Sequence, residues 1–209
     1  MRNTAITKDI QAALTPNTVL QDLLAGNTRY TSNNLTASNV NDLVTQTTGG
    51  QFPKAVILSC IDSRVPVEMV FDQTIGDVFV ARVAGNFENV DILGSMEYSC
   101  AVAGSKLVLV LGHESCGAVK AACDGVELGN ITSMLNNITP AVKLASEQVA
   151  GENNSSNSDF VAKTVENNVK LTIDRIREKS KILQEMEDNG EIAIVGGVYS
   201  LKTGQVTML

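Results

Sequence analysis

Four short, almost uninterrupted apolar runs constrain the fold of this chain more than any other feature of its sequence. They cover residues 54–59, 78–83, 106–111 and 192–198. Continuous apolar runs of this length are typical of strands that are buried on both faces, as strands are in a parallel sheet. Because segments of helical periodicity separate the runs, the sequence predicts an α/β fold with a mainly parallel β-sheet flanked by helices.

The segments between and after the runs predict the helices and the last turn of the chain. Helical patterns cover residues 91–104, about 116–123, 131–149 and 159–188. Ser158 or Asp159 is expected to cap the last of these helices, because short polar side chains accept hydrogen bonds from the first free N–H groups of a helix. Residues 198–209 are predicted to form a C-terminal β-hairpin that turns at 202–204.

The first fifty residues predict an N-terminal helical arm. Apolar residues recur there at four-residue spacing, at Ile6, Ile10 and Leu14. Thr15 and Pro16 have the pattern of an N-cap followed by proline at the first helical position. A second helix is therefore expected to start at this pair.

The end of the arm and the domain organisation follow from composition. We expect Gly26 to loosen the end of the second helix, and residues 31–50, rich in Ser, Thr, Asn and Gly, to form a loop with a short amphipathic turn. No internal repeat or convincing boundary divides the chain. We therefore predict a single domain over 1–209, made of the arm (1–50) and an α/β core (51–209).

The charge balance excludes two classes of partner. The chain has 16 Lys and Arg against 23 Asp and Glu, a net charge of −7 and a pI near 4.7. It therefore repels phosphate backbones and anionic lipids, and we expect no nucleic-acid and no membrane partner. The apolar runs also fall far short of the roughly 20 residues of a membrane helix. No apolar stretch follows Met1, so we expect a cytoplasmic location, or a periplasmic one if a signal peptide has been removed.

The positions of three Cys and His residues predict a shared site. Four cysteines in 209 residues are too sparse for a disulfide scaffold, and intracellular Cys/His sets more often mark metal sites or catalysis. Cys60 directly follows the first apolar run, and His113, the only histidine, follows the third. Both are expected at the carboxyl ends of parallel strands, where ligand sites gather. Cys116 lies three residues after His113, so one ion can accept both side chains.

These residues predict a zinc site with a vacant position. Thiolate and imidazole ligands favour zinc over magnesium or calcium. Three protein ligands leave the fourth tetrahedral position for water, which is typical of catalytic zinc. The alternative is that the cysteines pack as small hydrophobic residues. We adopt that interpretation for Cys100 and Cys123, with a disulfide between them as its own alternative.

A charged pair follows the first predicted ligand. In extended backbone, residues two apart project to one face, so Cys60, Asp62 and Arg64 are expected to look into the same cavity. The alternative is a surface ion pair that contributes almost nothing. Glu114 and Ser115, which separate the second and third predicted ligands, are expected to face solvent, with support of the ligands as the alternative.

Together these motifs resemble the β-class carbonic anhydrases. The family pattern is Cys-x-Asp-x-Arg, here at 60–64, followed by His-x-x-Cys, here at 113–116. The likeness runs from about Gln51 to Val126, and it includes the segments 78–86, 94–98 and 112–119. It is weaker over the arm and after Ser133, although 196–199 and the final hairpin also look similar to the family.

The resemblance implies a zinc-dependent lyase. Cys60, His113 and Cys116 would bind Zn²⁺, and Asp62 and Arg64 would form the catalytic pair. The implied reaction is the reversible hydration of carbon dioxide to bicarbonate and a proton through a zinc-bound hydroxide. Asp62 would accept the hydrogen of that hydroxide, while Arg64 keeps Asp62 ionised and off the zinc. Some family members place this Asp on the zinc, and we expect the open state here.

The resemblance also implies a substrate pocket shared between subunits. Gln51, Phe79 and Tyr98 fall where the family lines a small, mostly apolar pocket, and Gln51 would donate a hydrogen bond to bicarbonate. Gly117, which follows Cys116 at the expected start of a helix, is expected to let the backbone approach closely and is counted with the substrate-binding residues. Part of that pocket comes from a neighbouring subunit in the family, so the chain is expected to form a homodimer or homotetramer. The N-terminal arm would embrace the neighbour.

Two departures from the family pattern limit the resemblance. The chain has no Trp, so a non-catalytic bicarbonate pocket that some bacterial members build partly from Trp cannot form in the same way. It has no second histidine, so proton transfer would fall to Tyr98, a carboxylate or buffer. Two alternative functions stay open: a hydrolase of carbon disulfide or carbonyl sulfide on the same scaffold, and a non-catalytic module stabilised by zinc.

Overall fold

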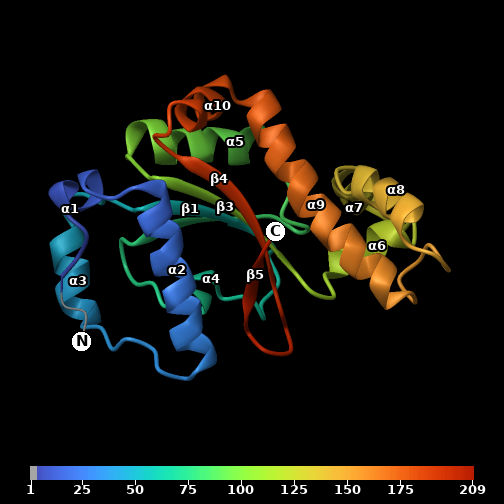
Figure 1. The fold of residues 1–209 in the computed structure, drawn as a ribbon, viewed down its shortest axis with the longest axis horizontal. Coiled ribbons are helices and arrows are strands. Elements are labelled where there is room, and N and C mark those ends of the chain that lie inside the picture. The colour runs from blue at the N-terminus through green and yellow to red at the C-terminus, as the bar shows by residue number, and fades with distance from the viewer. Residues whose placement is uncertain (1–3) are drawn as a thin grey trace.

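The computed structural model describes residues 4–209, which form a five-stranded β-sheet with helices around it (Figure 1). The strands are β1 (Ala55–Ser59), β2 (Val78–Arg82), β3 (Leu107–His113), β4 (Ala193–Tyr199) and β5 (Val206–Met208). Their order is β2-β1-β3-β4-β5, with all pairings parallel except that of β5 with β4. The predicted α/β fold, its mainly parallel sheet and the C-terminal hairpin are confirmed.

The four parallel strands coincide with the four apolar runs. Every residue of β1 and β3 is buried. Alternate side chains of β1 enter different core clusters: Ala55 and Ile57 pack in one, and Val56 and Leu58 in another. The continuous apolar sequence of these strands is therefore explained by a packed layer on each face of the sheet.

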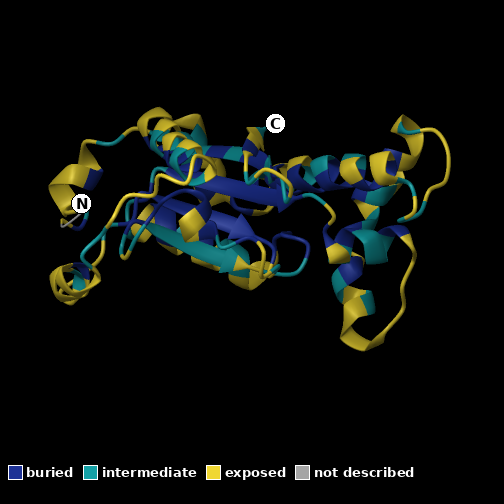
Figure 2. Cartoon of the chain, turned by 90° about the horizontal axis from the view of Figure 1, so that it is seen from below, coloured by how far each residue is buried: buried dark blue, intermediate teal, exposed yellow. Residues whose placement is uncertain are grey.

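The helices form those two layers and a lobe (Figure 1). One face carries α2 (Pro16–Thr31) and α4 (Val67–Val70), and the other carries α5 (Val90–Glu97), α9 (Ser158–Lys179) and α10 (Lys181–Asp188). Three helices pack with α9 as a lobe: α6 (Gly117–Cys123), α7 (Gly129–Leu135) and α8 (Thr139–Gln148). Figure 2 shows the inner strands buried between these layers, the edge strand β2 partly buried, and the outward faces of the helices exposed. Within residues 4–209, none of the helices has the length and apolar character needed to cross a membrane.

The single helix predicted over 131–149 is wrong, because a proline within this segment starts a second helix. The segment 131–149 forms α7, which ends at Leu135, and α8, which begins at Thr139 with Pro140 in its first turn. Proline lacks an N–H group and its ring clashes with the preceding turn, so it is tolerated at the start of a helix but not inside one. Sequence periodicity alone did not separate the two helices.

Two further predicted helices are interrupted. The segment 91–104 consists of α5 followed by a wider π-helical turn, η1 (Tyr98–Val102). The segment 159–188 breaks at Ser180, whose extended backbone ends α9 and whose hydroxyl accepts the N–H of Leu183 at the start of α10. The predicted helix at 116–123 is present as α6.

The N-terminal helices are not a free arm. The predicted cap of α2 is confirmed, because the Thr15 side chain accepts a hydrogen bond from the N–H of Thr18. Val19 and Leu23 of α2 are fully buried in the core cluster that includes β1 and β3. The loop that was expected over 31–50 contains a helix, α3 (Val40–Thr47), and a shorter helix, α1 (Lys8–Ala12), precedes α2.

Gly26 has a different role from the predicted one. Helix α2 continues past it to Thr31, and Gly26 is buried inside the helix. A Cβ atom at this position would lie 1.9 Å from the carbonyl oxygen of Phe71. The absence of a side chain therefore lets α2 approach the backbone after α4 closely. The neighbouring Asn27 uses this approach to donate a hydrogen bond of 3.0 Å to the carbonyl of Val70.

We predict that Gly26→Ala destabilises the protein by about 2–3 kcal/mol, because the added methyl group must displace backbone. Gly49→Ala is the matched control: its Cβ would have nothing within 4 Å, and the change should stay within about 0.5 kcal/mol. Urea denaturation of both variants and the wild type measures the difference. Equal free energies of unfolding for the two variants would contradict the close contact.

Candidate metal centre

Parallel pairing of β1 and β3 brings the first two predicted ligands together. Ser59 at the end of β1 is in register with Leu111 of β3, so Cys60 follows one strand beside the place where His113 ends the other. Cys116 is the N-cap residue of α6, which starts immediately after it. The ligating atoms of Cys60, His113 and Cys116 all lie within 4.8 Å of one another, and all three residues are buried.

The hydrogen bond of His113 leaves one nitrogen free. Its Nδ1 lies 2.9 Å from the carbonyl oxygen of Glu114, which can only accept a hydrogen bond, so Nδ1 carries the proton. The buried Nε2 has no hydrogen-bond partner among residues 4–209. A buried imidazole nitrogen with a free lone pair, next to two thiols, is a donor arrangement for a metal ion.

The two thiols affect one another's ionisation. Their sulfur atoms lie 3.9 Å apart. The Cys116 thiol, aided by His113 and by the N–H of Gly85, lowers the pKa of Cys60 to about 4 although burial opposes this. The adjacent Cys60 sulfur, together with burial, raises the pKa of Cys116. Ionisation of one sulfur thus opposes ionisation of the other, whereas a divalent ion between them would stabilise both thiolates.

Asp62 lies beside this cluster and is held by Arg64. The Asp62 Oδ2 atom is 3.8 Å from His113 Nε2. Arg64 donates to both carboxylate oxygens, from Nε to Oδ1 at 3.0 Å and from Nη2 to Oδ2 at 2.7 Å. These bonds, with a backbone bond from the same residue, hold the pKa of Asp62 far below its usual range although burial opposes them. Asp62 is therefore held as a carboxylate at neutral pH.

The predicted extended geometry of this segment is wrong. The N–H of Val65 donates to the carbonyl of Asp62 at 3.1 Å, and the N–H of Arg64 donates to Asp62 Oδ1 at 2.9 Å, so the chain turns here. Alternation of side chains does not apply in a turn. The side chain of Asp62 is 14% exposed and faces the cluster, while that of Arg64 is 58% exposed and reaches it only through Asp62.

Loops that carry the cluster are fastened by residues that sequence reasoning did not single out. Arg82 Nε donates to the carbonyl of Cys60 at 2.8 Å, and its Nη2 donates to the carbonyl of Asp62 at 2.7 Å. Gly85 donates its N–H to the Cys60 sulfur at 3.4 Å, and its carbonyl accepts a 2.7 Å bond from buried Asn168. No local sequence signal connects these residues, because α9, β2 and β1 meet only in the folded chain.

Gly85 requires both its backbone conformation and its lack of a side chain. Its φ of +83° belongs to the left-handed region that glycine adopts readily. A Cβ atom there would lie 2.4 Å from Ile138 Cδ1. The loop that presents an N–H to the Cys60 sulfur therefore depends on glycine.

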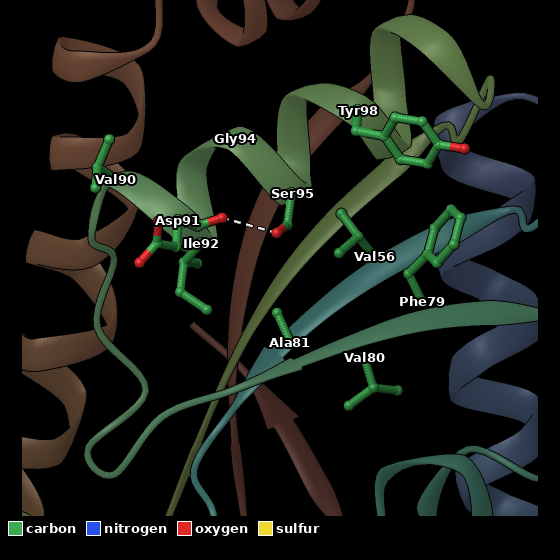
Figure 3. Close-up of a pocket in the computed structure, with 10 residues that line it drawn as sticks. All are labelled: Val56, Phe79, Val80, Ala81, Val90, Asp91, Ile92, Gly94, Ser95 and Tyr98. Carbon is green, nitrogen blue, oxygen red and sulfur yellow. Dashed lines mark hydrogen bonds between the residues drawn. The ribbon is translucent and has the colours of Figure 1, made fainter.

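Three predicted pocket residues lie away from the cluster. Phe79 and Tyr98 contact each other edge to face, with ring centroids 6.2 Å apart, and line a cavity of about 730 Å³ between β2 and α5 (Figure 3). Phe79 pairs with Val56, four residues before Cys60, so about 13 Å of strand separates it from the cluster. Gln51 lies earlier still, in an exposed hollow beside Gly76. One chain does not bring these side chains to Asp62.

The other predicted residues are close to the cluster or unrelated to it. Gly117 is the first residue of α6, directly after Cys116, and a Cβ there would have nothing within 4 Å. Cys100 and Cys123 are free and buried in different core clusters, so the predicted packing role holds and the alternative disulfide is wrong. Glu114 does not simply face solvent as expected, because its carboxylate accepts two hydrogen bonds from Ser200 and Leu201.

Comparisons with known proteins agree on one family. A family model described as carbonic anhydrase matches residues 55–206. A carbonic anhydrase of Mycolicibacterium smegmatis is 37% identical over 166 residues, which are 77% of this chain and 77% of that protein. Carbonic anhydrase 2 of Mycobacterium tuberculosis is 36% identical over 164 residues, covering 76% and 75% of the two chains.

Solved structures of β-carbonic anhydrases have a similar fold. One of two tetrameric β-carbonic anhydrases from Sordaria macrospora matches with a TM-score of 0.71 and 22% sequence identity. The match covers 79% of this chain and 85% of that one. At this level of identity the likeness establishes the fold.

Proposed function

This chain belongs to the β-class carbonic anhydrases, and we propose that it catalyses the reversible hydration of carbon dioxide to bicarbonate and a proton at a zinc ion held by Cys60, His113 and Cys116. One observation carries the proposal. The unpartnered Nε2 of His113 and two buried sulfurs converge beside an aspartate that is held ionised. The cytoplasmic location remains a prediction from the sequence.

The donor atoms of this chain fit zinc. Two thiolates and one neutral imidazole are soft and borderline ligands, which select zinc over magnesium and calcium. When bound, zinc supplies a nucleophile at neutral pH, because it lowers the pKa of water from about 15.7 toward about 7. Three protein ligands leave one tetrahedral position for that water.

Asp62 is proposed to orient the reacting water. Its carboxylate accepts a hydrogen bond from that water and so turns an oxygen lone pair toward the carbon of carbon dioxide. Arg64 donates to both oxygens of Asp62, which keeps the carboxylate ionised and turned toward its partner rather than toward the metal. This pairing supports the open state expected from the sequence, in which Asp62 is not a ligand.

A second copy of the chain is proposed to complete the substrate pocket. In the described residues, β2 has a neighbour on one side only, so its outer edge is free. Two such edges related by a two-fold axis pair antiparallel, which places Phe79 of one copy beside the carboxyl end of β2 in the other. That end carries Arg82, which holds the Cys60 loop.

The surface next to this edge supports the same assembly. Val90 of α5 and Tyr98 of η1 are each more than half exposed and line the same cavity as Phe79 (Figure 3), and Val102 at the end of η1 is also more than half exposed. Large apolar side chains clustered at the surface are typical of protein interfaces. We propose a homodimer or a homotetramer, and the Sordaria macrospora relatives are described as tetrameric.

We predict that wild-type protein carries about one zinc ion per chain and that Cys60→Ser and His113→Ala lose the metal together with carbon dioxide hydration. Cys100→Ser is the matched control, because it changes a buried cysteine outside the cluster and should keep both. Elemental analysis after gel filtration, with stopped-flow hydration assays, measures the outcome. Full zinc content in either ligand variant would reject the site.

Asp62→Asn should keep its zinc but lose hydration activity by at least about 100-fold, because the amide no longer accepts the hydrogen of water in the required orientation. Asp174→Asn, an exposed carboxylate on α9, should have wild-type activity. Zinc content and stopped-flow hydration are measured on both, with sulfide release from carbon disulfide to test the alternative hydrolase. Unchanged hydration in Asp62→Asn would remove this residue from the mechanism.

The shared pocket predicts complementation between two inactive variants. In a mixed dimer of Asp62→Asn and Gln51→Ala chains, one site receives intact Asp62 and intact Gln51 from different copies. After joint refolding, random pairing should restore about a quarter of wild-type activity. Asp62→Asn mixed with the double variant is the control and should restore none. A mixture that shows only the sum of its separate activities would place all site residues in one chain.

A further inference from the structure

Glu114 occupies an unusual position between two proposed zinc ligands. Its backbone is held on both sides: the N–H donates to the carbonyl of Tyr199 at 3.0 Å, and the carbonyl accepts the Nδ1–H of His113 at 2.9 Å. Its Oε2 atom accepts the hydroxyl of Ser200 at 2.9 Å and the N–H of Leu201 at 3.0 Å. The residue thus joins the ligand loop to the end of β4.

The carbonyl of Glu114 determines which nitrogen of His113 is free. Because that carbonyl can only accept, it keeps the proton on Nδ1 and leaves the lone pair of Nε2 for the cluster. The direction of the carbonyl depends in turn on the backbone of Glu114. The next residue, Ser115, has a φ of +51°, so the chain turns sharply here and cannot rely on regular secondary structure to fix the carbonyl.

The hairpin residues that hydrogen-bond to Glu114 are themselves held by further hydrogen bonds. Ser200 bonds across the hairpin, with its N–H on the carbonyl of Gln205 and its carbonyl on the N–H of Gly204. Asn27 of α2 holds the far strand, because its side chain donates to the carbonyl of Gly204 and accepts the N–H of Val206. The carboxylate of Glu114 therefore attaches to a hairpin that its own backbone bonds and Asn27 of α2 keep in place.

We propose that Glu114 is a positioning residue for His113: its carboxylate fastens the loop between the two proposed ligands to the hairpin, which aims its carbonyl at Nδ1 and Nε2 at the metal. The inference rests on the proposed zinc site, and it assigns the hairpin a part in holding the metal. Groups that orient a ligating histidine typically contribute about 10- to 100-fold to metal affinity.

The substitutions that test this follow from the use of a single carboxylate oxygen. Glu114→Gln keeps an oxygen acceptor for both Ser200 and Leu201, and it should bind zinc within about threefold of wild type. Glu114→Ala removes both bonds and should bind zinc about 10- to 100-fold more weakly. Ser200→Ala removes one of them, should fall between the two, and serves if Glu114→Ala does not fold.

Zinc affinity is measured by competition with a chelator, which needs no activity. Glu187→Ala is the matched control: it removes a carboxylate that accepts a backbone N–H at the start of β4, from Ile194 at 3.0 Å, far from the ligands. It should lower thermal stability and leave zinc affinity unchanged. The charge-transfer spectrum of the cobalt-substituted protein should change in Glu114→Ala and not in Glu187→Ala.

The outcomes distinguish this inference from the proposed function. If wild-type protein does not bind zinc, the site itself is wrong. If wild type binds zinc and both Glu114→Ala and Ser200→Ala bind it equally tightly with an unchanged cobalt spectrum, the positioning role is wrong. Equal losses of affinity in Glu114→Ala and Glu187→Ala would also overturn it, because the effect would then be one of general stability.

Discussion

The parallel pairing of β1 with β3 is the constraint on which the rest of the site depends. Each strand ends in a residue that can bind a metal, and only a parallel arrangement places those two ends at the same edge of the sheet. In an antiparallel pair, Cys60 and His113 would lie at opposite ends. The apolar side chains that bury both faces of these strands therefore also determine where the chemistry occurs.

Burial makes it costly to leave the polar atoms of the cluster without partners. The interior stabilises neither an unpaired imidazole nitrogen nor two neighbouring thiolates: His113 Nε2 has no hydrogen-bond partner among residues 4–209, and the Cys60 sulfur and burial raise the pKa of Cys116. A divalent cation would relieve both at once. Binding of the proposed metal would for this reason be coupled to folding of these loops, which hydrogen bonds of Arg82, Asn168 and Glu114 hold in place.

The separation of Phe79 and Gln51 from Asp62 gives the proposed oligomer a chemical role. Phe79 is paired with Val56, six residues before Asp62, and Gln51 lies earlier still. Small movements within one chain therefore cannot bring these side chains into one pocket with Asp62. The free edge of β2 and the exposed apolar residues of α5 and η1 offer a surface through which a second copy can supply them. In the proposed oligomer, assembly would be part of building the active site.

Several features could be predicted from the sequence because they depend on local residue types. The apolar runs predict buried strands, Thr15 and Pro16 predict a helix start, and the positions of Cys60, His113 and Cys116 predict the cluster that the structure brings together. The two motifs at 60–64 and 113–116 also indicate the protein family. Each of these signals is contained within a short stretch or in residues at strand ends, so no knowledge of distant packing is needed.

Only the tertiary structure decided the rest, because it depends on contacts between segments far apart in the sequence. Gly26 looks like a helix-weakening residue until the backbone of Phe71 is seen against it, and Glu114 looks exposed until the hairpin folds back onto it. The turn at 62–65 replaces the extended geometry because Asp62 hydrogen-bonds the backbone of Arg64. The residue type determines which interactions a side chain can form, and the tertiary packing determines which partner it contacts.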